Sequence, residues 1–196
     1  MSPRAGLNRA AVVEAAAALA DEEGFEDLSL ARLAERLGVR KPSLYNHVAG
    51  LEGIRRELVL TGLRELGRAL SRATVGVSGE AAILALGQAY RDFVKERPGL
   101  YAATVRSYRT YAPGDPALAA AEGEALETVL TVLASCGFRG EGAVHAARGL
   151  RAVAHGFATL EAAGGFGIPT DVDDSFQRLL RVFVAGLRIE EAGRER

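Results

Sequence analysis

The chain has 196 residues, 48% of them hydrophobic and 25% charged, and its formal net charge is −1. This balance is typical of a globular protein, and the length allows one or two small domains with hydrophobic cores. The single cysteine, Cys136, excludes an intrachain disulfide framework and favours a cytoplasmic location. We expect no signal peptide, because the N-terminus lacks an apolar core, and no run of about 18 apolar residues predicts a membrane span.

The first predicted helix begins after Asn8, a suitable N-cap residue, and ends near Glu23, before Gly24. Its apolar residues recur at helical spacing and predict one buried stripe, formed by Val12, Ala16, Leu19 and Ala20. The acidic residues around its end are interpreted as a solvated face. They are Asp21, Glu22, Glu23, Glu26 and Asp27.

Residues 28–48 predict a helix-turn-helix. Leu30, Leu33, Ala34 and Leu37 share one face of a short helix that Ser29 can cap. Gly38 follows the last apolar residue, where a left-handed backbone commonly ends a helix. A short connection then leads to a proline at residue 42, which suits the first turn of a second helix. Apolar residues at positions 44 and 48 can pack that second helix onto the first.

The outer face of the second helix carries side chains that donate hydrogen bonds to phosphates or base edges. They are Lys41, Ser43, Tyr45, Asn46 and His47. Residues 28–56 contain six basic and two acidic residues, a net charge of +4, so the rest of the chain carries about −5. Basic charge is therefore concentrated where a recognition helix would meet the major groove of DNA. The alternative is a solvated helical hairpin whose arginines have no such role.

Further helices are expected over the remainder, and no convincing strand pattern occurs. A long helix over residues 51–72 carries two apolar stripes, which is typical of a connector that touches two bodies. The other predicted helices cover about 79–97, 98–105, 116–135, 140–164 and 172 onward. The sequence thus predicts an all-α fold of about nine helices. Its predicted parts are a DNA-binding domain over 1–50, the connecting helix over 51–72, and a ligand-binding and dimerisation domain over 73–196.

An enzyme is disfavoured by the absence of the usual motifs. The three histidines, His47, His145 and His155, form no H-x-x-x-H or H-E-x-x-H pair, and a single cysteine cannot complete a zinc site with them. The G-x-S-x-G and P-loop patterns are also missing. We therefore expect no catalytic residues, metal or cofactor. A helical module that binds another protein through its basic motif remains the alternative function. Cys136 lies in an apolar run, which favours a buried inert thiol over a redox sensor.

The segment L-A-R-L-A-E-R-L-G-V-R-K-P-S-L-Y-N-H-V, followed by a larger helical part, resembles the TetR family of bacterial transcriptional regulators. The resemblance covers roughly residues 8–58. A second stretch, A-H-G-F-A-T-L-E-A-A-G over residues 154–164, is similar to one branch of the family, marked by H-G-x-x-x-L-E. The resemblance implies a homodimer that binds a palindromic operator, is released by a small molecule, and dimerises through its last two helices as a four-helix interface.

The family's motif places Tyr45 and His47 at the DNA backbone and Lys41 and Ser43 nearest the base edges. Ser29 occupies the position that caps the first motif helix and often touches phosphate. Many members carry a phosphate-contacting lysine where this chain has Leu51, so either Arg55 substitutes for that lysine or the contact is missing. The predicted DNA-binding set is Ser29, Arg40, Lys41, Pro42, Ser43, Leu44, Tyr45, Asn46, His47 and Arg55.

Two further residue sets are predicted in the larger domain. A pocket between helices should be mostly apolar with a few polar groups. Its candidate lining is Tyr90, Phe93, Tyr101, Tyr108, His155, Phe157 and Glu161, although each aromatic residue can equally be core and His155 a core or interface residue. The terminal helix has a large apolar stripe, which predicts a dimer interface over packing within one subunit. The interface set is Phe157, Val172, Phe176, Leu179, Leu180, Phe183 and Leu187. Gly149, Gly156 and Gly186 are expected to allow close approach of helices.

Overall fold

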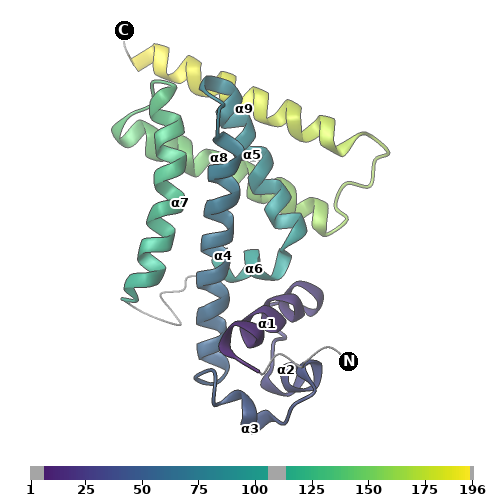
Figure 1. The fold of residues 1–196 in the computed structure, drawn as a ribbon. Coiled ribbons are helices and arrows are strands. Elements are labelled where there is room, and N and C mark those ends of the chain that lie inside the picture. Colours follow the sequence, from purple (N-terminus) through teal and green to yellow (C-terminus); the bar gives the residue numbers. More distant parts are fainter. Residues whose placement is uncertain (1–6, 106–113, 195–196) are drawn as a thin grey trace. The chain divides into compact units, whose positions relative to one another are not determined.

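A computed structural model describes residues 7–105 and 114–194 of the chain (Figure 1). Within these ranges the protein consists of nine α-helices and contains no β-strand, which confirms the predicted all-α fold. The helices are α1 (Arg9–Glu23), α2 (Leu30–Leu37), α3 (Lys41–Leu44), α4 (Gly50–Thr74), α5 (Gly79–Glu96), α6 (Pro98–Val105), α7 (Pro116–Ser135), α8 (Gly140–Ala162) and α9 (Val172–Arg194). No helix in the described ranges is long and apolar enough to cross a membrane.

By their internal contacts, the residues gather into two compact units. Of the described residues, the first unit comprises 7–64, 97–105 and 114–121, and the second comprises 65–96 and 122–194. Helices α4 and α7 each pass from one unit into the other. The division into 1–50, 51–72 and 73–196 stays a prediction about function, whereas these units describe which residues pack together.

In the first unit, α1 packs against α2 and α6. Asp21 near the end of α1 caps α6, because its Oδ1 accepts hydrogen bonds from the backbone N–H groups of Gly99 (2.8 Å) and Leu100 (3.1 Å). Its Oδ2 accepts a hydrogen bond from Arg97 Nε at 2.7 Å. A Cβ at Gly99 would lie 2.2 Å from the carbonyl carbon of Ala20, so only glycine allows this approach. The acidic end of α1 therefore caps and holds α6, in addition to being partly exposed to solvent.

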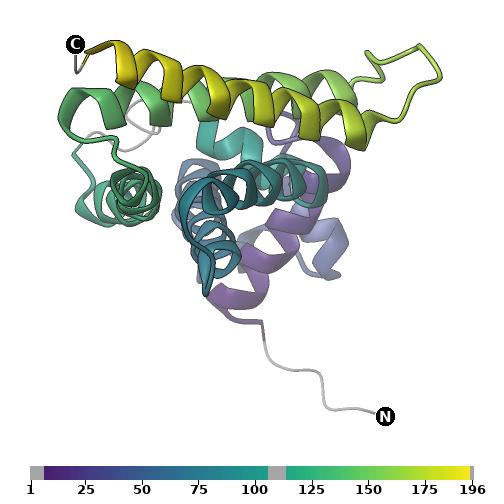
Figure 2. The same cartoon turned by 90° about the horizontal axis from the view of Figure 1, so that it is seen from above.

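In the second unit, α5 packs against α8 and α9, and α8 also packs against α9, which lies over it when seen from above (Figure 2). The centre of this packing holds a charged side chain, Arg91, which is 1% exposed. Glu161 of α8 accepts from Arg91 Nε at 2.7 Å and Nη2 at 2.8 Å, and Asp173 of α9 lies 2.7 Å from Nη2. The guanidinium carbon also lies 5.4 Å from the ring centroid of Phe157 and 5.0 Å from that of Phe176. One buried cation thus ties three helices together.

Candidate nucleic-acid interface

The turn between α2 and α3 is fixed by local hydrogen bonds. The hydroxyl of Ser29 caps α2 by accepting from the N–H of Arg32 at 3.3 Å. Gly38 ends α2 with φ at 65°, and its N–H donates to backbone carbonyls of the last turn. The N–H of Val39 bonds Ala34 O at 3.0 Å, which closes the helix end. These two predicted roles, for Ser29 as cap and Gly38 as C-terminal stop, set the direction in which the chain enters α3.

The second helix of the motif is shorter than its sequence pattern predicts. It covers only Lys41–Leu44, with proline in its first turn. Beyond it the backbone tightens, because Tyr45 N–H bonds Pro42 O (3.3 Å) and His47 N–H bonds Leu44 O (2.9 Å). Val48 N–H also bonds Leu44 O, at 3.0 Å. Residues 45–47 are therefore hydrogen-bonded turns that continue the helix in a tighter winding.

The exposed side of this segment contains most of the residues predicted to contact DNA. Tyr45 is 57% exposed. Arg40, Lys41, Pro42 and Asn46 are also exposed, whereas Ser29, Ser43 and His47 are half-buried. Leu44 is the exception, because its side chain is fully buried between the helices of the unit. We therefore correct its inclusion in the DNA-binding set: Leu44 holds the motif together and does not face outward.

Ion pairs within the unit change the charge pattern inferred from the sequence. Arg36 donates to both carboxylate oxygens of Glu22, at 2.6 and 2.7 Å, and Arg32 pairs with Glu23. These bonds hold the pKa of the Glu22 carboxyl below its usual value and raise the pKa of the Arg36 guanidinium. The acidic run at the end of α1 thus neutralises arginines that the count over residues 28–56 had assigned to DNA. The run was visible in the sequence, but its pairing with α2 was not.

The two arginines at the start of α4 are also engaged. Arg56 pairs with Glu57 at 2.6 Å and with Asp115 at the start of α7. Arg55 pairs with Glu52 at 3.1 Å, lies 5.9 Å above the ring of Phe25, and is only 18% exposed. Arg55 is thus partly engaged within its own unit, and its role as a substitute for the missing phosphate-contacting lysine stays a prediction.

Two basic side chains of the motif keep their charge unpaired. Of the six basic residues between positions 28 and 56, all of which the structure describes, only Arg40 and Lys41 have no acidic partner. Both are exposed and both lie at the start of α3. The positive charge available to a phosphate is therefore smaller than predicted, and it is concentrated at the entry of the second motif helix, where an N-terminal helix dipole adds to it.

The residues predicted to bind a ligand lie on several helices, and their common site stays a prediction. Tyr90 and Phe93 are buried on α5, and Tyr101 is buried on α6, in the other unit. His155 and Phe157 are half-buried on α8. Tyr108 lies outside the described residues. Glu161 accepts hydrogen bonds from Arg91 and, at 2.8 Å, from Lys95. This carboxylate is therefore occupied by the packing of its own unit.

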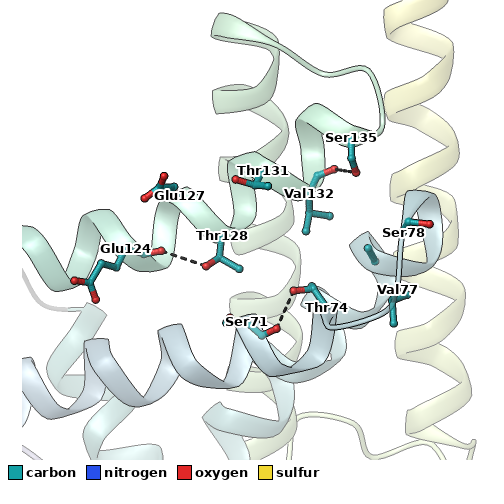
Figure 3. A pocket seen from close by; sticks show the side chains of 11 residues that line it. Ser71, Thr74, Val77, Ser78, Glu124, Glu127, Thr128, Thr131, Val132 and Ser135 are labelled. Carbon is teal, nitrogen blue, oxygen red and sulfur yellow. Dashed lines mark hydrogen bonds between the residues drawn. The ribbon is translucent and has the colours of Figure 1, made fainter.

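An open cleft of about 500 Å³ lies elsewhere in the second unit. It is lined by the end of α4, the start of α5 and the second half of α7 (Figure 3). None of the predicted ligand-binding residues lines it. Sequence reasoning missed this cleft, because it searched for aromatic residues and the lining is made of hydroxyl, carboxylate and small aliphatic side chains.

The predicted dimer stripe on α9 divides into an inner and an outer part. Phe176 and Leu180 are fully buried in their own unit, and a Cβ at Gly87 of α5 would lie 2.7 Å from Leu180. We therefore correct their inclusion in the dimer interface. Leu179 is exposed, whereas the rest of the predicted set is half-buried: Phe157, Val172, Phe183 and Leu187.

Two apolar residues on the outer side of α9 were missed. Val182 is 70% exposed and Ile189 is 75% exposed. With Leu179 and Gly186 they recur at i, i+3, i+7 and i+10, a helical spacing that the sequence already contained beside the inner stripe. The inner stripe contains larger aromatic residues, so its periodicity is more pronounced than that of the outer residues. The outer side of α9 is thus an exposed apolar face.

The three glycines that were expected to allow close approach of the last two helices differ in their surroundings. A Cβ at Gly149 would lie 2.8 Å from the ring of Phe183, so this glycine allows α8 and α9 to approach within one chain. Gly156 and Gly186 have open space around them.

Cys136 is half-buried and not buried as expected, with its sulfur 3.8 Å from the hydroxyl of Ser135. Within the described residues, no cluster of three acidic, histidine or cysteine side chains is placed to hold a metal.

Comparison with known families gives matches to both parts of the chain. Residues 12–58 match the family described as bacterial regulatory proteins, tetR family. Residues 83–183 match the family described as tetracyclin repressor-like, C-terminal domain. The second match includes the H-G-x-x-x-L-E segment, whose meaning as a branch marker stays a prediction.

Similar proteins cover nearly the whole chain. An uncharacterized HTH-type transcriptional regulator of Bacillus subtilis, YobS, is 39% identical over 96% of this chain and 97% of its own. An uncharacterized HTH-type transcriptional regulator of Mycobacterium tuberculosis is 35% identical over 93% of this chain and 83% of its own. Among solved structures, a protein of unknown function from Rhodococcus sp. RHA1 has a TM-score of 0.77 at 24% identity, over 94% of this chain and 97% of its own.

Proposed function

The chain belongs to the tetR family of bacterial regulatory proteins and is a DNA-binding regulator of transcription; from this premise we propose that it is a repressor. It binds a palindromic operator as a homodimer, and a small molecule releases it. The observation that carries the proposal is the exposed, unpaired charge of Arg40 and Lys41 beside the exposed Tyr45 and Asn46. A cytoplasmic location is part of the same proposal.

The docking follows from this arrangement. The start of α3 enters the major groove, as second helices of helix-turn-helix motifs do. Lys41 and Ser43 then lie nearest the base edges and select sequence, whereas Tyr45 and His47 bond the DNA backbone. Arg40 precedes the helix and adds a phosphate contact. The buried Leu44 supports the docking by fixing the segment onto α2.

Dimerisation is supported by the outer side of α9. A palindrome is read by two recognition helices about 34–36 Å apart, and one chain contains one such helix. The exposed stripe of Leu179, Val182 and Ile189 is an apolar surface that a second copy can cover. Gly156 on α8 and Gly186 on α9 have open space around them, which allows a partner helix to approach closely. The last two helices of each subunit would then form a four-helix interface.

Release by a ligand requires a path between the units, and the chain itself provides one. Only Arg97 separates the last residue of α5 from the first residue of α6. Because Asp21 of α1 bonds Arg97, Gly99 and Leu100, we infer that a change at Arg97 would be felt by α1, which packs against α2 of the motif. A ligand acts in this way only if it binds the DNA-free arrangement more tightly than the DNA-bound one.

Selection of binding sites from a random DNA library, at two salt concentrations, tests the proposal. The expected result is an enriched palindrome whose binding weakens steeply with salt. Arg40→Gln should lower the magnitude of the log–log salt slope by about 1, because one phosphate contact is lost. Arg36→Gln is the matched control: its guanidinium is already paired with Glu22, so the slope should stay unchanged.

The alternative is a helical module that binds another protein through the same motif. In that case no DNA sequence is enriched, and salt abolishes the remaining weak binding. Equal effects of Arg40→Gln and Arg36→Gln would also contradict the proposed docking, since they would show that general charge and not the exposed motif attracts DNA.

A further inference from the structure

The cleft in the second unit differs chemically from the aromatic pocket that the sequence predicts. Ser71 and Thr74 from the end of α4 line one side, and Thr128, Thr131 and Ser135 of α7 line the other (Figure 3). Its volume of about 500 Å³ lies in the range of sites for small organic molecules, about 300–1,000 Å³. The lining is thus rich in hydroxyl oxygens.

Three of these hydroxyl groups donate their hydrogen atom to a backbone carbonyl of their own helix. Thr74 donates to the carbonyls of its own helix at 3.0 and 3.3 Å, Thr128 donates to Glu124 O at 3.3 Å, and Ser135 donates to Val132 O at 2.7 Å. A hydroxyl that has donated its only hydrogen offers lone pairs alone. Toward the cleft, these side chains therefore act as hydrogen-bond acceptors.

The charged side chains that line the cleft are all acidic. Glu124 and Glu127 contribute two carboxylates to its lining, and none of the eleven lining residues is basic. Helices α4 and α7 end at Thr74 and Ser135, so two C-terminal ends with partial negative charge border the cleft, together with the N-terminal end of α5 at Gly79, whose partial charge is positive. The aliphatic side chains of the lining offer contact to methylene groups: Val77, Ala82 and Val132.

We propose that this cleft binds an organic cation in which several ammonium groups are joined by methylene segments, a linear polyamine being the simplest form. Its N–H groups donate to the hydroxyl oxygens of Thr74, Thr128 and Ser135. The two carboxylates offset part of its charge, and its methylene segments contact the aliphatic lining. As an effector site the cleft rests on the proposed regulatory function, whereas binding itself does not.

Titration of the full-length, DNA-free protein with spermidine in a calorimeter at 150 mM salt tests the site. The expected result is saturable binding of one molecule per chain. Thr128→Val, which keeps the shape and removes the acceptor, and Glu124→Gln should each weaken binding at least tenfold. Glu141→Gln, on the exposed start of α8 in the same unit, is the matched control and should leave the affinity unchanged. Thermal unfolding confirms that each variant is folded.

Absence of saturable binding overturns the proposal. Equal weakening by Glu141→Gln and Glu124→Gln also overturns it, because general attraction to an acidic surface would then explain the heat. Adding spermidine to the complex with selected operator DNA distinguishes binding to the cleft from a regulatory effect of that binding. If spermidine binds the cleft but does not release DNA, the binding site is supported and its role as an effector site is wrong. If no operator can be selected, the proposed regulatory function is wrong, whereas the calorimetric test of the cleft still holds.

Discussion

Replacing Glu161 by glutamine removes the main counter-charge of a buried guanidinium. Arg91 is 1% exposed, and Glu161 holds it through two hydrogen bonds of 2.7 and 2.8 Å. Glutamine keeps the size of the side chain but has no negative charge and one acceptor oxygen. Asp173 remains beside Nη2, but its side chain is 78% exposed, so its attraction is screened by water. The variant therefore leaves a buried cation with little compensation.

Removing one partner of a buried ion pair costs about 3–5 kcal/mol. Because Glu161 itself is 18% exposed and Asp173 stays in place, we expect a value at the lower end, about 3 kcal/mol of unfolding free energy. For a chain of this length, that loss lowers Tm by roughly 6–12 °C. The double variant Arg91→Met, Glu161→Met should recover most of the loss, because an apolar pair of similar volume avoids the desolvation cost.

Thermal unfolding followed by circular dichroism, at one fixed protein concentration, measures these changes. Asp174→Asn is the matched control on α9, because its partner Arg178 is 74% exposed and such a surface pair contributes less than about 0.5 kcal/mol. If Glu161→Gln shifts Tm no more than Asp174→Asn, the argument that Arg91 depends on its counter-charge is wrong.

The same pair gives a pH dependence. Hydrogen bonds from Arg91 lower the pKa of the Glu161 carboxyl from its usual 4.5. The contribution of Glu161 to stability is therefore complete above about pH 4.5 and is lost as the pH falls below that value through the lowered pKa. The difference in Tm between the wild type and Glu161→Gln should shrink as the pH falls through this range, and a constant difference would contradict the charge-based explanation.

Three other changes test different parts of the molecule. Tyr45→Ala should weaken binding to every selected DNA site by about 1.5 kcal/mol, roughly tenfold, in a fluorescence-anisotropy titration, because a hydrogen bond to a phosphate is lost; unchanged affinity would contradict the docking. Val182→Asp should dissociate the proposed dimer in analytical ultracentrifugation, whereas Val75→Asp, similarly exposed but outside the α9 face, should not, and identical behaviour would remove α9 from the proposed interface. Gly99→Ala should destabilise the protein by about 2–3 kcal/mol, because its Cβ would lie 2.2 Å from a backbone carbon of α1. Gly123→Ala, in open space within α7, should stabilise it by up to about 1 kcal/mol, and similar effects of both substitutions on Tm would refute the close approach.

The helix-turn-helix was predictable because its signals act over a few residues. A hydroxyl three residues from the N–H that it caps, a glycine with positive φ, and a proline in a first turn depend on local geometry alone. The apolar spacing of Leu30, Leu33 and Ala34 gave the buried face of α2 for the same reason. The length of α3 was less predictable. Over a single turn, an α-helix and a turn with i→i+3 hydrogen bonds place apolar residues at similar spacing, so the pattern does not distinguish them.

The candidate site depended more strongly on distant residues. Charge counting over residues 28–56 included Arg36, but its partner Glu22 lies outside that window and 14 residues away. The stripes of α9 show the same limit. Periodicity identified one apolar stripe, and only contact with α5 decided that Leu180 is core, whereas Val182, outside the predicted stripe, is exposed.

The sequence by itself therefore determined the all-α fold and the helix-turn-helix, because helix spacing, caps and turns are local properties of the chain. The family of regulators came from the resemblance of the motif segment to known regulators. Tertiary structure alone decided which charges remain available and which apolar residues face outward. Arg91 and Glu161 are 70 residues apart, and the cleft is assembled from α4, α5 and α7. Such arrangements depend on how helices pack, and side-chain packing between distant segments leaves no periodic signal in one sequence.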